Sequence, residues 1–271
     1  MATIKRNAAY SLALSVSQVL YPLVVYPHVS RVLGPEGMGS IGFVESFQQY
    51  FVMLAALGVP IYGVREIARV SQDTQSRSRV FSEIAVIHLV STLVVSVLYM
   101  GLYLTVDRLS GYRELFLIST GILYLQVFTV EWLFQGLEQF RVVAIRGILS
   151  KILAVVAIFV FVRDVGDVAA YYGITLGVTL FSVVINLSYA RSWVTLRLNG
   201  VTLRPHLKPM FYLLSFGLVT QVYTVLDTVI LGFLRNEAEV GFYVLPVRLI
   251  RVIITVLTAV ILVTVPRLSG Y

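Results

Sequence analysis

Four cations that interrupt apolar stretches are the residues of this sequence best suited to chemistry. Arg248 and Arg251 lie three positions apart in the apolar stretch 244–265, so they share one face of a helix. Lys151 lies roughly ten residues, or about 15 Å, inside a second such stretch. Because a cation in hydrocarbon is costly unless water, a partner helix or an anion receives it, these three residues predict an anion-binding site inside a membrane. Arg146 is shallower, and we expect its side chain to reach the surface along its helix.

Acidic and amide side chains form stripes on three of the other apolar stretches. They are Glu45, Gln48 and Gln49; Glu131 and Gln135; and Gln221, Thr224, Asp227 and Thr228. One interpretation is a polar cavity for sugars with a proton-linked carboxylate, for which Glu45 and Glu131 are better candidates than Asp227, expected near the outer surface. The other is hydrogen bonding between helices or pairing with the nearby cations. For the arginines near residue 250, that second interpretation means an ion pair with Glu45 or Glu131.

Metal, cofactor and enzyme signatures do not compete with this interpretation. The chain contains no cysteine, and its three histidines, His28, His88 and His206, are too scattered to predict a metal cluster. The sequence has no nucleotide-binding glycine loop, no zinc-protease motif and no nucleophile elbow. We therefore expect no metal, no cofactor and no enzymatic activity.

The composition places these residues in a polytopic membrane protein. Hydrophobic residues make up 58% of the chain, charged residues only 13%, and the mean hydropathy is +0.87. A soluble domain carries about 25% charged residues. With roughly 20 apolar residues per crossing, the sequence predicts an all-α fold with about eight spans, at residues 8–30, 40–64, 81–106, 115–135, 142–162, 168–190, 210–234 and 240–265.

The basic residues predict the orientation of these spans. With the N-terminus in the cytoplasm, the inner loops hold twelve cations, which are Lys5, Arg6, Arg65, Arg69, Arg77, Arg79, Arg141, Arg191, Arg197, Arg204, Lys208 and Arg267. The outer loops hold five, which are Arg31, Arg108, Arg113, Arg163 and Arg235. This asymmetry is the positive-inside pattern, so the net charge of +7 needs no nucleic-acid partner.

The first two predicted spans form a hairpin with a distinctive sequence. Residues 31–39, Arg-Val-Leu-Gly-Pro-Glu-Gly-Met-Gly, predict a sharp turn, because Pro35 fixes its φ and three glycines permit unusual dihedral angles. The second span leads into Arg-Glu-Ile-Ala-Arg at residues 65–69. Together these segments resemble the first hairpin of the bacterial Wzx-like polysaccharide flippases, which belong to the multidrug/oligosaccharidyl-lipid/polysaccharide exporter superfamily.

The resemblance implies a domain organisation of two six-span lobes that face each other across a cavity. Residues 1–190 would form the first lobe and residues 210–271 the first hairpin of a second, which leads us to expect a truncated sequence. A shift of about 202 residues lays Gly39 on Gly241, as expected for a repeat. The connector 191–209 would be cytoplasmic, either as a small hairpin around Asn199-Gly200 or as a plain linker.

The resemblance also implies a function, a location and partners. It predicts a flippase in the bacterial cytoplasmic membrane that moves polyprenyl-diphosphate-linked oligosaccharides, with Arg31 and Arg146 joining the three deeper cations in the substrate site. The expected partners are this lipid-linked oligosaccharide, membrane lipids, a coupling proton or sodium ion, and polysaccharide polymerase and export proteins. Two alternatives stay open: an ion-coupled multidrug antiporter of the same superfamily, and a non-transporting membrane scaffold or fragment.

Overall fold

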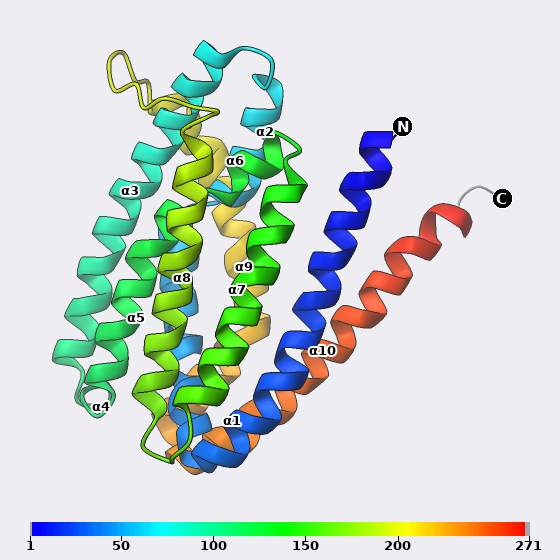
Figure 1. The fold of residues 1–271 in the computed structure, drawn as a ribbon. Coiled ribbons are helices and arrows are strands. Elements are labelled where there is room, and N and C mark those ends of the chain that lie inside the picture. The colour runs from blue at the N-terminus through cyan, green and yellow to red at the C-terminus, as the bar shows by residue number, and fades with distance from the viewer. Residues whose placement is uncertain (1, 269–271) are drawn as a thin grey trace.

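The chain folds as a bundle of long helices (Figure 1). The computed structural model describes the backbone of residues 2–268 and the side chains of residues 6, 7 and 9–254. Its elements are α1 (Ala2–Ala56), α2 (Val59–Arg69), α3 (Thr74–Thr105), α4 (Asp107–Ser110), α5 (Arg113–Gln126), the 3₁₀ turn η1 (Val127–Thr129), α6 (Glu131–Gly136), α7 (Phe140–Phe161), α8 (Val168–Ala190), α9 (Arg204–Leu234) and α10 (Glu237–Leu268). No strand occurs in residues 2–268. The predicted all-α polytopic membrane fold is confirmed.

The helices overlap the predicted spans, although their exact number stays a prediction. Within the described residues, six helical segments are long and apolar enough to cross a membrane. The first of them, Ala9–Arg69, contains both of the first two predicted spans. The eighth predicted span falls in α10, whose side chains from residue 255 onward lie outside the described residues.

Helix α1 reverses its direction at a single residue. Gly34 has φ 67° and ψ −175°, a backbone conformation that favours glycine, and it is the non-helical residue at which α1 divides into two helices. Pro35 follows it, and proline both disfavours a helical conformation in the preceding residue and suits the first turn of the next helix. The prediction of a turn over residues 31–39 was therefore too broad, because a glycine–proline step alone reverses the chain.

Gly39 of this segment and Gly241 of α10 allow the two helices to pack closely. A Cβ atom on Gly39 would lie 1.8 Å from the carbonyl oxygen of Glu237, and one on Gly241 would lie 1.8 Å from the carbonyl oxygen of Pro35. The contact is reciprocal under the 202-residue shift, which pairs Pro35 with Glu237 and Gly39 with Gly241. The absence of side chains at these two positions allows the backbones of α1 and α10 to touch.

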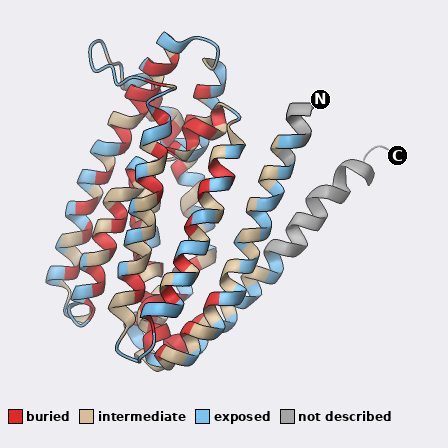
Figure 2. Ribbon diagram, viewed as in Figure 1, coloured by how far each residue is buried: buried red, intermediate tan, exposed pale blue. Residues whose placement is uncertain are grey.

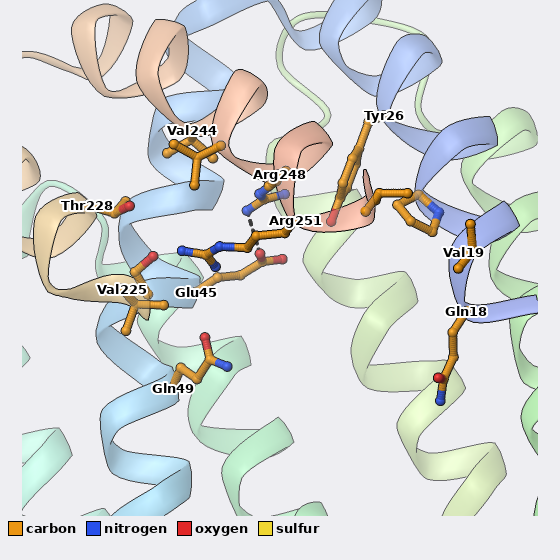
Figure 3. Close-up of a pocket in the computed structure, with 14 residues that line it drawn as sticks. Gln18, Val19, Tyr26, Glu45, Gln49, Val225, Thr228, Val244, Arg248 and Arg251 are labelled. Atoms are coloured by element: carbon orange, nitrogen blue, oxygen red, sulfur yellow. Dashed lines mark hydrogen bonds and ion pairs between the residues drawn. The ribbon is translucent and has the colours of Figure 1, made fainter. Parts of the chain in front are cut away.

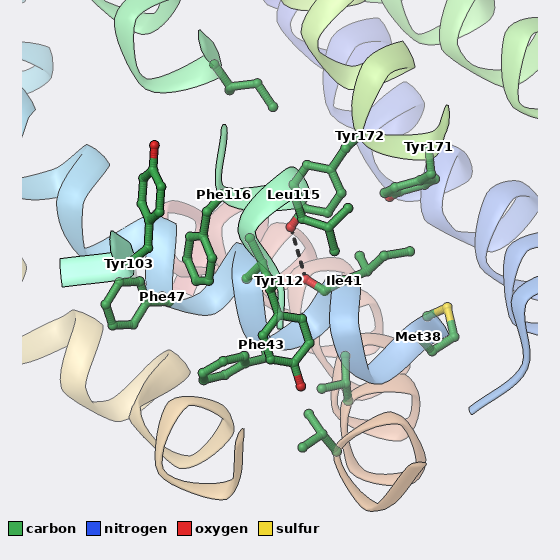
Figure 4. Close-up of a cluster of buried hydrophobic side chains, with 14 of the residues drawn as sticks. Met38, Ile41, Phe43, Phe47, Tyr103, Tyr112, Leu115, Phe116, Tyr171 and Tyr172 are labelled. Carbon is green, nitrogen blue, oxygen red and sulfur yellow. Dashed lines mark hydrogen bonds between the residues drawn. The ribbon is translucent and has the colours of Figure 1, made fainter. Parts of the chain in front are cut away.

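Aromatic side chains fill the core near this reversal. Phe47 contacts the rings of Tyr99 and Phe116 with centroid distances of 5.9 and 5.6 Å, and the hydroxyl of Tyr172 donates a hydrogen bond to the carbonyl of Ile41 (Figure 4). Exposed residues follow the outer faces of the helices (Figure 2). Many of the exposed residues are large and apolar; Val97, for example, is 70% exposed. Such a surface is expected of a bundle that faces lipid.

The connections alternate between the two ends of the bundle, as the predicted spans require. The α1 reversal, α4 and the turn after α7 lie at one end, and α2, the N-terminus and the α8–α9 connector lie at the other (Figure 1). Which end faces the cytoplasm stays a prediction, and the side chains of Lys5 and Arg267 lie outside the described residues.

The α8–α9 connector is an extended linker held against α3. The backbone N–H groups of Thr195 and Arg197 donate to the hydroxyls of Ser78 and Ser82, and that of Thr202 donates to Glu83 at 2.9 Å. Residues 191–203, all described, contain no strand, so of the two alternatives the linker is observed and the paired hairpin is not.

Candidate functional site

A polar pocket lies where both halves of α1 meet α9 and α10 (Figure 3). Its volume is about 290 Å³. The first half of α1 contributes Gln18 and Tyr26, and the second half contributes Glu45 and Gln49. Helix α9 contributes Val225 and Thr228, and α10 contributes Arg248 and Arg251. The two arginines that the sequence placed on one helical face do line one site.

Arg248 is held inside this pocket by a carboxylate and an aromatic ring. Its Nη2 donates to Oε2 of Glu45 at 2.6 Å, and its guanidinium carbon lies 5.1 Å from the centre of the Tyr26 ring. The Arg248 side chain is 12% exposed, whereas that of Glu45 is 37% exposed. The pairing of Arg248 with Glu45, which the sequence left as an alternative, is present. A cation–π contact with Tyr26 adds to it.

The charged residues of the pocket are two arginines and one glutamate, which leaves a net charge of +1. The register of α10 against α1 sets this arrangement. Besides the Gly39–Gly241 contact, Gly42 leaves room for Val244, because a Cβ atom on Gly42 would lie 2.6 Å from a methyl carbon of that valine. Val244 precedes Arg248 by one helical turn, so the valine contact orients the arginine toward Glu45. Because its net charge is positive, the pocket can accept an anion.

The remaining predicted cations lie elsewhere. Lys151 of α7 donates a hydrogen bond to the Ser17 hydroxyl of α1 at 3.2 Å. Arg31 is exposed in the last turn of α1 before the reversal. Arg146 is buried and forms an ion pair with Glu131 of α6, so the prediction that it reaches the surface was wrong. A partner on α6, invisible in the local sequence, keeps it inside.

The predicted amide and acidic residues also separate. Gln48 is buried and donates through Nε2 to the Ser119 carbonyl of α5 at 3.0 Å, which is helix-to-helix bonding. On α9, Asp227 is exposed and accepts hydrogen bonds from the Tyr243 hydroxyl and, at 2.7 Å, from the Thr228 N–H. Gln221 has a buried Nε2 with no hydrogen-bond partner among the described residues.

None of these outlying residues lines the α1–α10 pocket as the described side chains form it: Lys151, Arg31, Arg146, Glu131, Gln48, Gln221 and Asp227.

Tyr26 was not among the predicted site residues. Gln18, Pro22 and Tyr26 are spaced four residues apart and line the pocket together, so a stripe on one helical face was the signal that could have found it. Tyr26 was overlooked because an aromatic residue in an apolar span is ordinary by itself.

A second group of polar contacts closes the end of the bundle at which α1 reverses. Arg108 of α4 donates through Nε to the Gly232 carbonyl at 3.0 Å, bonds the Arg235 carbonyl and lies 3.8 Å from Glu237. The Tyr112 hydroxyl donates to the same glutamate, and this hydrogen bond holds the pKa of Glu237 below its usual value. We call Arg108, Tyr112 and Glu237 the end clasp. It ties α4 and α5 to the turn between α9 and α10.

Comparisons with known proteins identify the family of this chain. Two curated relatives carry the name "Putative O-antigen transporter". The one from Escherichia coli (strain K12) is 25% identical over 88% of this chain and 58% of its own length, and the one from Shigella dysenteriae is 24% identical over 88% and 60%. The chain thus spans about three fifths of these relatives' length. No solved structure matches it significantly. A family profile described as "Polysaccharide biosynthesis protein" matches residues 4–271, and the chain belongs to that family.

Proposed function

We propose that this chain takes part in moving polyprenyl-diphosphate-linked oligosaccharides across the bacterial cytoplasmic membrane, with its N-terminus in the cytoplasm. The observation that carries the proposal is the α1–α10 pocket, in which Arg248 and Arg251 outweigh Glu45 in charge. A diphosphate with a hydrophilic glycan cannot cross hydrocarbon unaided, whereas its polyprenyl tail can stay in lipid. A guanidinium matches phosphate oxygens with two parallel hydrogen bonds. Family membership and the names of the two relatives support this substrate class.

Glu45 has a definite part in this mechanism. In the empty pocket it neutralises Arg248, which would otherwise be an uncompensated buried charge. An arriving diphosphate would replace the carboxylate as the acceptor, and Glu45, already 37% exposed, would turn toward water. Departure of the substrate would restore the ion pair and so would favour release.

Alternating access is the second component of the proposal. We assign residues 1–190 and 210–271 to two lobes joined by the linker 191–209, of which residues 204–209 already belong to α9. The reciprocal Gly39–Gly241 contact supports a repeat that relates them. The first half of α1 and α10 lie together at the clasped end and diverge toward the other (Figure 1), as expected of a state open to the cytoplasm. The coupling ion, proton or sodium, and contacts with polymerase and export proteins remain predictions.

An ion-coupled multidrug antiporter is the second candidate, because Glu45 is a carboxylate inside the pocket. For a cationic substrate Glu45 would be the ligand and the arginines would hinder binding. Replacing the arginines by neutral residues would then preserve or improve transport, whereas the flippase mechanism requires them.

Complementation of glycan export in a strain that lacks its own flippase tests the proposal. The doubly substituted Arg248→Ala, Arg251→Ala protein should insert normally and export no glycan, and lysine at both positions should restore only part of the activity. Arg163→Ala is the matched control, since Arg163 is exposed and is not among the described residues that line the pocket. Normal export by the double variant would refute the proposed site, and a lack of export by the unaltered chain would favour a non-transporting scaffold or an inactive fragment.

A further inference from the structure

A second cationic groove is lined by residues from the start of α7 and the end of α8. These parts of α7 and α8 lie at the same end of the bundle as the start of α1 (Figure 1). Its volume is about 490 Å³, and its lining includes Gln139, Arg141, Ile145, Arg146, Leu149 and Tyr189. No residue is shared between the described linings of this groove and the α1–α10 pocket. The two sites therefore can be tested separately.

The groove changes from polar to apolar along α7. Arg141, Ile145 and Leu149 are spaced four residues apart and so lie on one helical face, with about 6 Å between successive positions. Arg141 is exposed at the helix start, and the two aliphatic side chains, 43% and 47% exposed, lie deeper in the span. A membrane lipid has the same gradient, from a charged headgroup to an acyl chain.

Arg146 supplies a buried polar group without a partner among the described residues, which indicates a ligand. Its side chain is more than nine-tenths buried, and its pairing with Glu131 uses Nη2. Its buried Nε has no hydrogen-bond partner among the described residues. An acceptor oxygen in the groove would satisfy this donor, since buried donors normally have partners.

The charge of the groove selects the ligand. Arg141 and Arg146 line it, and the described lining includes no aspartate or glutamate. Glu131, the partner of Arg146, offsets one of the two cations, which leaves a net charge of +1 at the mouth of an apolar groove. Basic pockets between transmembrane helices on the cytoplasmic side bind the headgroups of anionic lipids.

We propose that this groove binds one anionic phospholipid of the surrounding leaflet. Its phosphate would lie on Arg141 and accept a hydrogen bond from Arg146 Nε, and an acyl chain would run along Ile145 and Leu149. The site goes beyond the proposed transport function, since a phospholipid bound here would be a structural lipid and not the transported substrate.

Native mass spectrometry of the purified protein in detergent tests this assignment with phosphatidylglycerol and phosphatidylcholine as probes. We expect one phosphatidylglycerol to be retained and phosphatidylcholine to be lost. Arg141→Ala should weaken retention about five-fold, the effect of one cation near a membrane surface, and Leu149→Trp should block it by filling the groove. Arg191→Ala is the matched control, because Arg191 is an exposed cation just after α8 that the described lining does not include.

Two results would overturn the proposal. One is the absence of specificity, seen as equal retention of both lipids or as equal effects of Arg141→Ala and Arg191→Ala. The other is displacement of phosphatidylglycerol by an equimolar polyprenyl diphosphate in an Arg141-dependent manner, which would make the groove a substrate site. Because the assay measures lipid retention and not export, a failed flippase proposal would leave its outcome unchanged.

Discussion

Removing the contacts of the end clasp should open the closed end of the bundle. Arg108→Ala removes most of these contacts in one substitution. Arg108 donates to the carbonyls of Gly232 and Arg235 and lies 3.8 Å from Glu237. Hydrogen bonds from a charged donor contribute about 1.5–3 kcal/mol each when buried. Arg108 is 37% exposed, so we discount the ion pair and assign about 2 kcal/mol to the contacts that Arg108 makes. That loss corresponds to a roughly 30-fold larger population of the opened state.

Cysteine accessibility measures this opening directly, because the chain contains no native cysteine. Thr228 lines the α1–α10 pocket and is 3% exposed, so Thr228→Cys reports access from the clasped end. A membrane-impermeant maleimide added outside should label it up to about 30-fold faster after Arg108→Ala. Glu239→Gln is the control, because Glu239 pairs with Arg235 within the same turn at 3.6 Å and does not bridge to α4. Equal labelling of the parent, the Arg108 variant and the control would refute the clasp.

Three further predictions concern Gly39, Glu45 and Glu237. Gly39→Ala should reduce the amount of inserted protein, because its Cβ would lie 1.8 Å from a backbone carbonyl and overpacking costs about 1–3 kcal/mol. Gly101→Ala is the control and should be tolerated, because no atom lies within 4 Å of its Cβ. Immunoblots of membranes compare the amounts of the two variants. Glu45→Gln should destabilise the protein by roughly 3 kcal/mol, because it leaves the buried Arg248 cation unpaired. Adding Arg248→Met should restore the melting temperature. A melting temperature that does not recover would contradict a structural role for the Arg248–Glu45 ion pair. Glu237 has a lowered pKa, so its contribution to the clasp is fully present above its ordinary pKa of 4.5 and is lost as the pH falls through the lowered pKa. Because maleimide reacts with the thiolate, each labelling rate is divided by that of a free thiol at the same pH. Acidification should raise this relative rate in the parent but not in Glu237→Gln.

Much of the architecture was predictable because hydropathy is a local property. Each apolar run of sufficient length must become a helix in lipid, since backbone groups there can bond only to one another. The glycine–proline step at Gly34 and Pro35 is local as well, and it located the first reversal. The family resemblance rested on the same short segments.

The sequence narrowed the partner of Arg248 to Glu45 or Glu131 but could not choose between them, because each pairing joins separate helices. The sequence indicated that Arg248 needs an anion, but an ion pair with Glu45, 203 residues away, depends on how α10 lies against α1. The same holds for Arg146, whose burial against Glu131 contradicted its expected exposure. Composition and spacing determined that this chain is a membrane bundle with costly internal charges. Only the tertiary packing, set by backbone contact at Gly39 and Gly241, decided which charges share a pocket and which are neutralised.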